Sequence, residues 1–280
     1  MLNEAQRERF EVVLVAPRNP LNIGAVARAM ANFGLRRLAV VAPYEAHWRE
    51  AKSAVGAPEI LKNARETESL AEAAADCTLV VGTGSLGRRK AEQPVVPLPE
   101  LAPRVAREIE RGGRVALVFG SEKHGLTRDD LAHCHLLVEI PTDSRQPSMN
   151  LGQAAAVCFY EIAARADAAA AAGSEGPHPI RKNKSPAKAA HPESDETGDT
   201  GGPASMRDLE LLAGVVEEAM AAANYSPAAM RGANRHDLHL LLRRLALTRR
   251  DARRVLGVFR RILWQLEHPK KGKREMTPGA

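Results

Sequence analysis

Five short apolar runs alternate with helical segments in the first half of the chain, and this alternation restricts the fold more than any other feature. The runs occupy residues 11–16, 37–42, 78–82, 114–119 and 136–140. After the first run, Val26, Ala29, Met30 and Phe33 recur at the spacing of a helix that faces a core, and another helix is expected near residues 101–111. Strands connected through helices pair in parallel, with helices over both faces of the sheet. We therefore expect an α/β fold built on a parallel sheet.

The composition changes after residue 165 and again after residue 202. We predict one domain over residues 1–165, a disordered linker over residues 166–202, where Ala, Gly, Pro and Ser dominate, and a basic helical domain over residues 203–280. Three helices are expected in the last part. Ser205-x-x-Asp208 and Thr248-x-x-Asp251 have the spacing of capping boxes at the first and third helix. The second helix takes its apolar stripe from Leu238, Leu241, Leu242 and Leu245.

The excess of positive over negative charge lies almost wholly in this C-terminal part. Residues 203–280 contain 15 Lys or Arg and 8 Asp or Glu, in a chain whose formal net charge is +6. Eight arginines are expected beside the apolar stripes of the last two helices, namely Arg243, Arg244, Arg249, Arg250, Arg253, Arg254, Arg260 and Arg261. Such helices can simply present a solvated face, but this concentration of charge favours a polyanion, and we predict RNA rather than DNA.

Other features of the sequence exclude several classes of protein. The first ten residues include acids and lack an apolar stretch, and no run approaches the length of a membrane span, so we expect a cytoplasmic protein that contacts no membrane. Aromatic residues make up only 4% of the chain, which argues against an aromatic sheet that stacks bases. Cys77, Cys134 and Cys158 are distant from one another and are interpreted as reduced core thiols. We expect no metal, because the consecutive side chains of residues 133–135 diverge.

Three polar loops follow the last three apolar runs. Because ligands bind beyond the carboxyl ends of strands in open α/β sheets, these loops are expected to gather around one crevice. The third loop is held extended by Pro141 and Pro147, and Ser148 and Asn150 stand where helix caps stand. The first loop, residues 82–87, reads GTGSLG. A dinucleotide site would require a helix to begin there and a strand that ends in an acid about 20 residues on. Neither follows, so a nicotinamide oxidoreductase is disfavoured.

Gly24 and Arg28 are one helical turn apart, away from the core-facing stripe. A glycine that permits close approach next to a guanidinium suits contact with a phosphate or a ribose. The alternative is a glycine near a helix start and an exposed arginine.

Three segments occur in the order NIGAVARAMANFG (residues 22–34), FGSEKHGL (residues 119–126) and IPTDSRQPSMNL (residues 140–151). They resemble the signature motifs of the SPOUT superfamily of knotted RNA methyltransferases, in the TrmH-like branch that methylates the ribose 2′-hydroxyl. The resemblance covers residues 10–165. The C-terminal helices, with LHLLLRRLALTRRDARRVLGVFRRILWQLE, resemble the tail of the TrmJ-type tRNA methyltransferases, which modify nucleotide 32 of the anticodon loop.

This resemblance implies a Rossmann-like parallel sheet with a trefoil knot, a homodimer, and S-adenosylmethionine held largely by backbone groups. The residues implied to line the cofactor are Thr83, Gly84, Ser85, Gly120, Ile140, Pro147, Ser148 and Met149. The residues implied to surround the reacting ribose are Asn22, Arg28, Glu122, Ser148 and Asn150, with Arg28 contributed by the other subunit.

The function that the sequence favours is therefore an S-adenosylmethionine-dependent tRNA 2′-O-ribose methyltransferase. An enzyme of the same family that modifies ribosomal RNA is one alternative. A protein of the same scaffold that binds RNA without catalysis is another.

Overall fold

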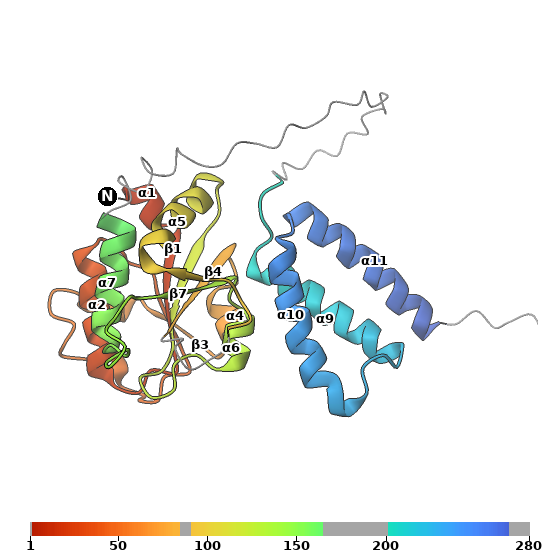
Figure 1. The fold of residues 1–280 in the computed structure, drawn as a ribbon, viewed down its shortest axis with the longest axis horizontal. Coiled ribbons are helices and arrows are strands. Elements are labelled where there is room, and N and C mark those ends of the chain that lie inside the picture. Colours follow the sequence, from red (N-terminus) through yellow and green to blue (C-terminus); the bar gives the residue numbers. More distant parts are fainter. Residues whose placement is uncertain (1, 85–90, 165–200, 269–280) are drawn as a thin grey trace, which may run out of the picture.

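The computed structural model describes residues 2–84, 91–164 and 201–268 (Figure 1). Its centre is a seven-stranded sheet in the order β3-β2-β1-β6-β4-β7-β5. Every pair of neighbouring strands is parallel. The strands are β1 (Phe10–Val15), β2 (Leu38–Val41), β3 (Arg65–Thr67), β4 (Leu79–Thr83), β5 (Val95–Pro97), β6 (Val115–Phe119) and β7 (Leu136–Glu139). The predicted α/β fold with a parallel sheet is confirmed.

The two strands that sequence patterning missed lie at the edges of this sheet. The five predicted runs correspond to β1, β2, β4, β6 and β7, with bounds that differ by at most one residue. β3 and β5 have three residues each and pair on one side only. Such short strands show no periodicity, and only the neighbouring strand gives them their conformation.

Helices cover both faces of the sheet. The first face carries α2 (Pro20–Asn32), α3 (Pro58–Lys62), α5 (Leu101–Glu110) and α7 (Leu151–Phe159), and the second carries α4 (Leu70–Ala73) and α6 (Arg128–Ala132). A short helix, α1 (Glu4–Arg7), precedes β1, and α7 continues into a π-helical turn at Tyr160–Ala164. The helix predicted near residues 101–111 is α5.

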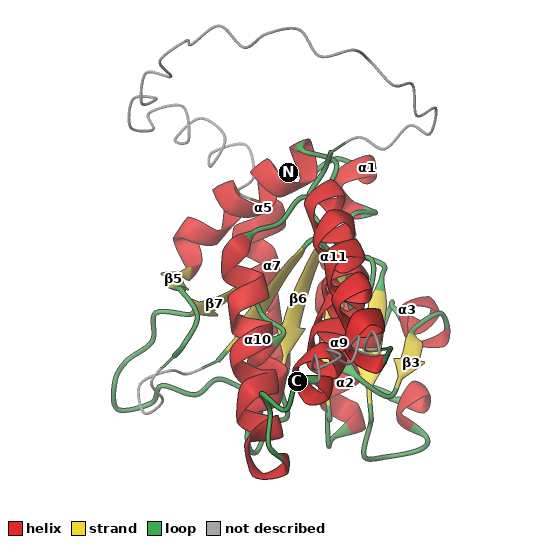
Figure 2. Cartoon of the chain, turned by 90° about the vertical axis from the view of Figure 1, so that its right-hand side faces the viewer, coloured by secondary structure: helices red, strands yellow, loops and turns green. Residues whose placement is uncertain are grey.

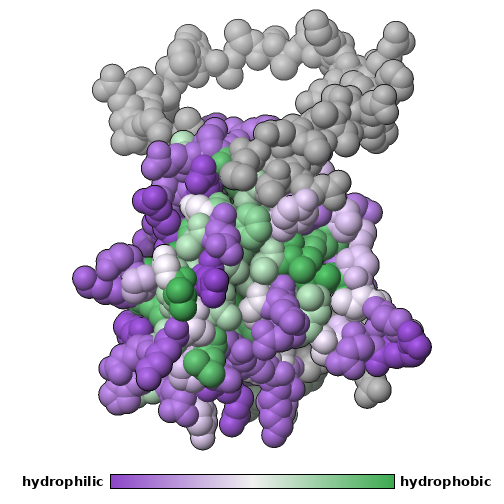
Figure 3. Space-filling view, turned by 90° about the vertical axis from the view of Figure 1, so that its left-hand side faces the viewer, coloured by the Kyte–Doolittle hydropathy of each residue, from purple (hydrophilic) through white to green (hydrophobic). Residues whose placement is uncertain are grey.

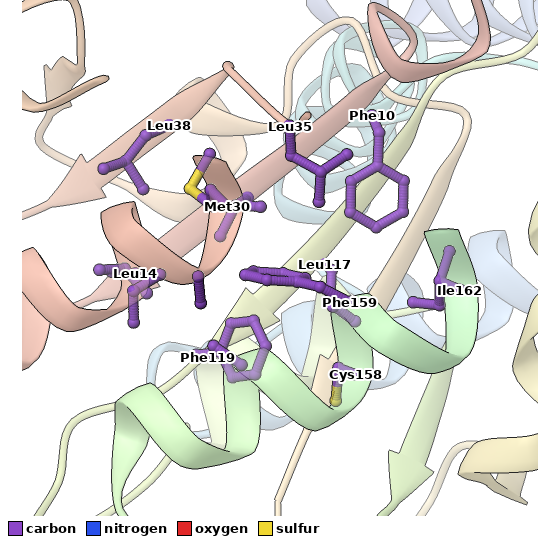
Figure 4. Close-up of a cluster of buried hydrophobic side chains, with 14 of the residues drawn as sticks. Phe10, Leu14, Met30, Leu35, Leu38, Leu117, Phe119, Cys158, Phe159 and Ile162 are labelled. Carbon is purple, nitrogen blue, oxygen red and sulfur yellow. The ribbon is translucent and has the colours of Figure 1, made fainter. Parts of the chain in front are cut away.

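Alternate residues of the central strands enter two separate cores. In β1, Val12 and Leu14 pack into the larger core, whereas Val13 and Val15 pack into the smaller one. Figure 4 shows the larger core, where Phe119 and Phe159 meet edge to face with ring centroids 6.1 Å apart. Both sides of each central strand are apolar, which is why these runs lack polar alternation.

The start, the buried side and the end of α2 agree with the prediction from the sequence. The Asn19 side chain accepts a hydrogen bond from the Leu21 backbone N–H, and Pro20 occupies the first turn, where its missing N–H costs nothing. Val26, Ala29 and Met30 are buried, and Phe33 packs at the margin of the core. The helix ends before Gly34, whose φ of +70° is a conformation that glycine adopts without a steric penalty.

Three helices form the C-terminal module, by which we mean residues 201–268. They are α9 (Met206–Ala222), α10 (Arg231–Leu245) and α11 (Arg249–Glu267). Ser205 and Asp208 form the predicted capping box of α9, and the Thr248 hydroxyl accepts from the Asp251 backbone N–H at the start of α11. The predicted stripe of α10 is half right. Leu238 and Leu242 are buried, but Leu241 and Leu245 are 44% and 53% exposed.

The module rests on the second face of the sheet domain through α9 and α10, and α11 lies on the far side (Figures 1 and 2). Met206 enters the smaller core, and its backbone N–H donates to the Cys77 carbonyl (2.9 Å). Of the linker predicted over residues 166–202, residues 166–200 lie outside the described residues.

All three cysteines are buried and unpaired, as predicted, and burial raises the pKa of each thiol to about 12. None of the helices within the described residues has both the length and the apolar character needed to cross a membrane.

Candidate active site

The three predicted loops do meet in one pocket, at the carboxyl ends of β4, β6 and β7. The pocket has a volume of about 280 Å³. β4 contributes Thr83 and Gly84, the loop after β6 contributes Gly120 to Leu126, and the segment after β7 contributes Ile140, Thr142 and Pro147 to Met149. Because the strands are parallel and adjacent, their polar ends converge at one edge of the sheet, as in other open α/β sheets.

The loop after β6 folds back on itself. The Gly125 backbone N–H donates to the Ser121 carbonyl (2.8 Å), and the two residues form an isolated bridge. A Cβ on Gly120 would lie 2.1 Å from the Gly125 carbonyl carbon and 2.2 Å from the Leu126 nitrogen. Backbone atoms cannot yield such space, so the turn that shapes this wall of the pocket requires glycine at position 120.

A chain of hydrogen bonds links the three motif segments beside the pocket. The Asn150 Nδ2 group donates to Asn22 Oδ1 (2.9 Å), and Asn22 Nδ2 donates to Glu122 Oε1 (2.8 Å). Asn150 is also the N-cap of α7, where its Oδ1 accepts from the Gly152 backbone N–H (2.9 Å). Asn22 lies in the first turn of α2. These bonds therefore fix the start of α2 and the start of α7 to the loop after β6.

The Glu122 carboxylate is the anchor of this chain of bonds. It also accepts the backbone N–H groups of Arg18 (2.9 Å) and Asn19 (3.1 Å). Partial burial raises the pKa of the Glu122 carboxyl, but the hydrogen bonds from Asn22 and from backbone N–H groups outweigh it, so the pKa lies below its ordinary value. Glu122 is consequently an ionised, fully engaged acceptor that holds the preceding loop in place.

The structure separates Gly24 from Arg28. Gly24 is buried, and a Cβ there would meet Ser53 Oγ at 2.2 Å and the Ala54 nitrogen at 2.9 Å. The interpretation of Gly24 as a ligand contact is therefore wrong, because its lack of a side chain lets the segment after β2 pack on α2. Arg28 is exposed on the outer side of α2 and, among the described residues, is not part of the pocket lining.

The predicted cofactor residues cluster in this pocket. Seven of the eight line it, namely Thr83, Gly84, Gly120, Ile140, Pro147, Ser148 and Met149, and Ser85 lies outside the described residues. Of the predicted ribose-binding residues, Glu122 and Ser148 line the pocket too. Asn22 is bonded to Glu122, and Asn150 is bonded to Asn22, whereas Arg28 does not reach the pocket in this subunit.

The lining residues suit S-adenosylmethionine. Leu126, Leu137 and Ile140 offer apolar contact for a flat purine. A Cβ on Gly84 would meet no atom of the described residues within 4 Å, so among these residues the backbone there borders space that a ligand can approach. Thr83, Gly84 and Gly120 add backbone N–H and carbonyl groups that can orient a nucleoside.

A charged cluster that the sequence did not predict lies between the sheet domain and the C-terminal module. His133, Glu210 and His239 bring their ligand-type atoms within 4.8 Å of one another. However, the buried Arg243 donates to Glu210 Oε1 (2.7 Å) and to the His133 carbonyl (3.3 Å). The guanidinium supplies the positive charge at this carboxylate, so an ion pair accounts for the cluster. The expectation that Arg243 contacts RNA is therefore wrong, because its side chain is only 3% exposed.

Comparison with known proteins agrees with the motifs. Residues 9–160 match the family model described as the SpoU rRNA Methylase family. A Pseudomonas aeruginosa protein named tRNA (cytidine/uridine/adenosine-2′-O-)-methyltransferase TrmJ is 41% identical over 161 residues, which cover 55% of this chain and 60% of that protein. The tRNA (cytidine/uridine-2′-O-)-methyltransferase TrmJ of Salmonella typhimurium is 31% identical over 276 residues, covering 95% of this chain and 99% of that protein.

A solved structure shares the whole architecture, including the helical module. The crystal structure of TrmJ from Z. mobilis ZM4 superposes with a TM-score of 0.71 and 27% identity, covering 90% of this chain and 98% of that chain. A Haemophilus influenzae protein described as a probable methylase family protein has a TM-score of 0.53 at 25% identity and covers 94% of this chain.

Proposed function

Because this chain belongs to the SpoU rRNA methylase family, we propose that it transfers a methyl group from S-adenosylmethionine to a ribose 2′-hydroxyl of tRNA. The observation that carries the proposal is the pocket at the ends of β4, β6 and β7, with Asn22, Glu122 and Asn150 bonded to one another beside it. The relatives that align along the full length of the chain are named tRNA methyltransferases, which supports tRNA as the substrate class. Nucleotide 32 of the anticodon loop stays the predicted target. The trefoil knot and the cytoplasmic location also stay predictions.

The residues of this chain mainly have to position a weak nucleophile. S-adenosylmethionine supplies a methyl group on a sulfonium, which is already an activated electrophile. Holding a ribose hydroxyl in line with it can supply about 7–11 kcal/mol of the barrier. The hydrogen bonds from Asn150 to Asn22 and from Asn22 to Glu122 suit this task, because they fix the elements around the pocket before any substrate arrives. Ser148 is exposed at the pocket rim, where its hydroxyl can bond to the ribose.

Glu122 is a poor candidate for the general base. Its carboxylate already accepts three donors, and its pKa lies below the ordinary value, so it holds protons weakly near neutral pH. A guanidinium is no base either, since it stays protonated in proteins and has no acceptor site. We assign Arg28 the role of clamping the target phosphate and stabilising the developing alkoxide, with the phosphate or a water molecule taking the proton.

Arg28 can perform this role only if a second subunit brings it to the pocket. It lies on the outer surface of α2, next to α7, and this surface is apolar. Leu21, Val157 and Tyr160 are 56%, 38% and 55% exposed on these two helices and their continuation. Figure 3 shows apolar side chains gathered on the side of the molecule that α2 and α7 form. Such a patch is typical of a self-association surface. We therefore propose a homodimer through α2 and α7, with Arg28 reaching the partner's pocket.

The direct test is ribose methylation of RNA. Total RNA from cells with and without this protein is compared for 2′-O-methyl groups, and the purified protein is supplied with S-adenosylmethionine and a tRNA transcript. A methyl group gained at one tRNA ribose supports the proposal. Methylation of ribosomal RNA alone would favour the ribosomal alternative, and cofactor binding without transfer to any RNA would favour a non-catalytic RNA-binding protein.

Arg28 variants test the proposed role of its guanidinium. Arg28→Ala should abolish turnover while cofactor binding, measured by calorimetry, stays normal. Arg28→Lys should also lose most activity, because an ammonium cannot form the paired bonds that a guanidinium forms with a phosphate. Near-normal turnover of Arg28→Lys would contradict the bidentate role.

Contribution from the partner subunit is tested by mixing two inactive variants. Gly84→Leu should fill the open space at the pocket and block the cofactor, and Arg28→Ala should lack the guanidinium. If Arg28 acts in the partner's pocket, mixed dimers contain one complete site, and activity returns when the two variants are co-expressed. If Arg28 acts in its own subunit, each mixed dimer pairs an Arg28→Ala subunit with a blocked one, and no activity returns.

A further inference from the structure

The solvent-facing side of α11 carries one aromatic residue that core packing does not explain. Ala252 and Leu256 are buried against α9, and Phe259 and Leu263 continue this apolar side toward the end of the helix. Trp264 follows Leu263 and is turned about 100° away from that side. It is 48% exposed. By contrast, Trp48 is fully buried and donates its Nε1 hydrogen to Glu66 (3.2 Å).

Arginines surround Trp264 on this side of the helix. At 3.6 residues per turn, the positions that share its side include five exposed arginines, Arg250, Arg253, Arg254, Arg260 and Arg261, and one exposed acid, Glu267. In the described part of the chain, Arg250, Arg254, Arg260 and Arg261 form no ion pair with a carboxylate. Since no described carboxylate pairs with these four guanidinium groups, the charge of the face complements a polyanion.

The immediate neighbours of Trp264 form a stacked column. The Arg261 guanidinium lies over the indole, 4.5 Å from the ring centroid, and the His268 ring stacks on Trp264 at 5.1 Å with an interplanar angle of 17°. Gly257, two turns earlier on the same side, leaves open space where a Cβ would meet no atom within 4 Å. Arg261 forms no hydrogen bond or ion pair with a described residue, so it can leave the indole without loss of a hydrogen bond.

We propose that Trp264 stacks an unpaired nucleobase of the RNA substrate, while Arg260 and Arg261 bind the flanking phosphates. Stacking on aromatic rings and guanidinium planes is the usual way in which proteins hold unpaired bases, and arginines follow the backbone. A protein partner would be expected to cover the apolar side of a helix, but Trp264 stands among unneutralised cations. The inference rests on the proposed action on RNA and adds the site that holds the RNA outside the catalytic pocket.

The first test measures binding of a tRNA transcript to the full-length protein by filter retention. Trp264→Leu keeps an apolar side chain but cannot stack, and we expect binding about 5- to 150-fold weaker. Trp264→Phe should retain most of the affinity. Tyr225→Leu serves as the control, because Tyr225 is an exposed aromatic residue (70%) of the same module that lies outside α11, at the turn between α9 and α10. Equal affinity of Trp264→Leu and the wild type would overturn the proposal, as would loss of self-association in place of RNA affinity.

The second test uses intrinsic fluorescence, since the chain has only two tryptophans and one is buried. An RNA hairpin with an unpaired loop should quench the wild type, and the quenching should vanish in Trp264→Phe even though that variant binds. A fully paired RNA duplex should quench far less. Equal quenching by the duplex, or quenching that survives in Trp264→Phe, contradicts base stacking.

These readouts do not depend on methyl transfer. A wild type that binds RNA through Trp264 but methylates none would refute the proposed function and leave this inference intact. If the Trp264→Leu variant methylates tRNA at the normal rate and with an unchanged KM for tRNA, this inference is refuted and the proposed function stands.

Discussion

Glycines at two ends of the same pocket have opposite surroundings. A side chain on Gly120 would collide with the backbone of Gly125 and Leu126, whereas a side chain on Gly84 would enter open space. The sequence alone marks both as glycines in polar loops. Only the structure shows that one is required by the protein and that the other leaves room for a ligand.

This difference predicts two distinct defects. Gly120→Ala should lower the free energy of unfolding by about 1–3 kcal/mol, because the loop after β6 must shift. Gly84→Ala should change the free energy of unfolding by no more than about 0.5 kcal/mol, yet weaken S-adenosylmethionine binding. Urea denaturation and calorimetric titration of both variants measure the two effects. A stable Gly120→Ala variant, or unimpaired cofactor binding by Gly84→Ala, would show that the pocket is shaped differently.

At the scale of single elements, the helix starts were the most predictable features. Ser205 and Thr248 were identified as caps from spacing alone, and both accept the backbone N–H of the aspartate three residues later. Caps are local, because donor and acceptor lie within one turn. The apolar stripe of α10 was less predictable. Which leucines are buried depends on where α9 and α11 lie, and that is decided outside the helix.

The cap of α11 supports a quantitative prediction. Thr248→Ala should lower the free energy of unfolding of the protein by about 1 kcal/mol, since the Asp251 backbone N–H loses its acceptor. Thr248→Ser keeps the hydroxyl and should be close to the wild type. Thermal and urea unfolding of the two variants provide the comparison. Equal destabilisation by alanine and serine would mean that the threonine methyl group, rather than the cap, matters.

At the scale of the whole molecule, a largely buried ion pair of the C-terminal module contacts the sheet domain through His133. Arg243 of α10 bonds to Glu210 of α9 and to the carbonyl of His133, which follows α6. Burial raises the pKa of the Glu210 carboxyl, but His133, His239 and Arg243 outweigh it and lower the pKa to about 2. Replacing one member of such a pair leaves an uncompensated buried charge.

Glu210→Gln should therefore destabilise the protein by about 3–5 kcal/mol at neutral pH. Glu217→Gln, on the same helix, breaks a pair with the largely exposed Arg235 and should cost at most about 1 kcal/mol. Chemical denaturation with a probe on the module gives both values. Similar losses in the two variants would show that the Glu210 pair contributes no more than a surface pair.

The lowered pKa of the Glu210 carboxyl predicts how the stability of the protein changes with pH. A group whose folded pKa is depressed stabilises the protein above its unfolded pKa, 4.5 here, and loses that effect as the pH falls toward about 2. The stability difference between the wild type and Glu210→Gln should thus be constant near neutral pH and shrink below pH 4.5. Denaturation curves across that interval measure it. A difference that stays constant down to pH 2 would contradict the assignment.

The sequence by itself determined the parallel α/β class, the five central strands, the capped helices and the three loops that form the pocket. These depend on apolar periodicity, turn residues and hydrogen bonds between near neighbours, all of which involve residues close together in the sequence. The tertiary structure alone decided the order of the strands, the edge strands β3 and β5, the burial of Arg243, the contact of Gly24 with residues 53 and 54, and the exposure of Trp264. Each of these depends on which distant segment lies opposite, and no local pattern in the chain specifies that partner.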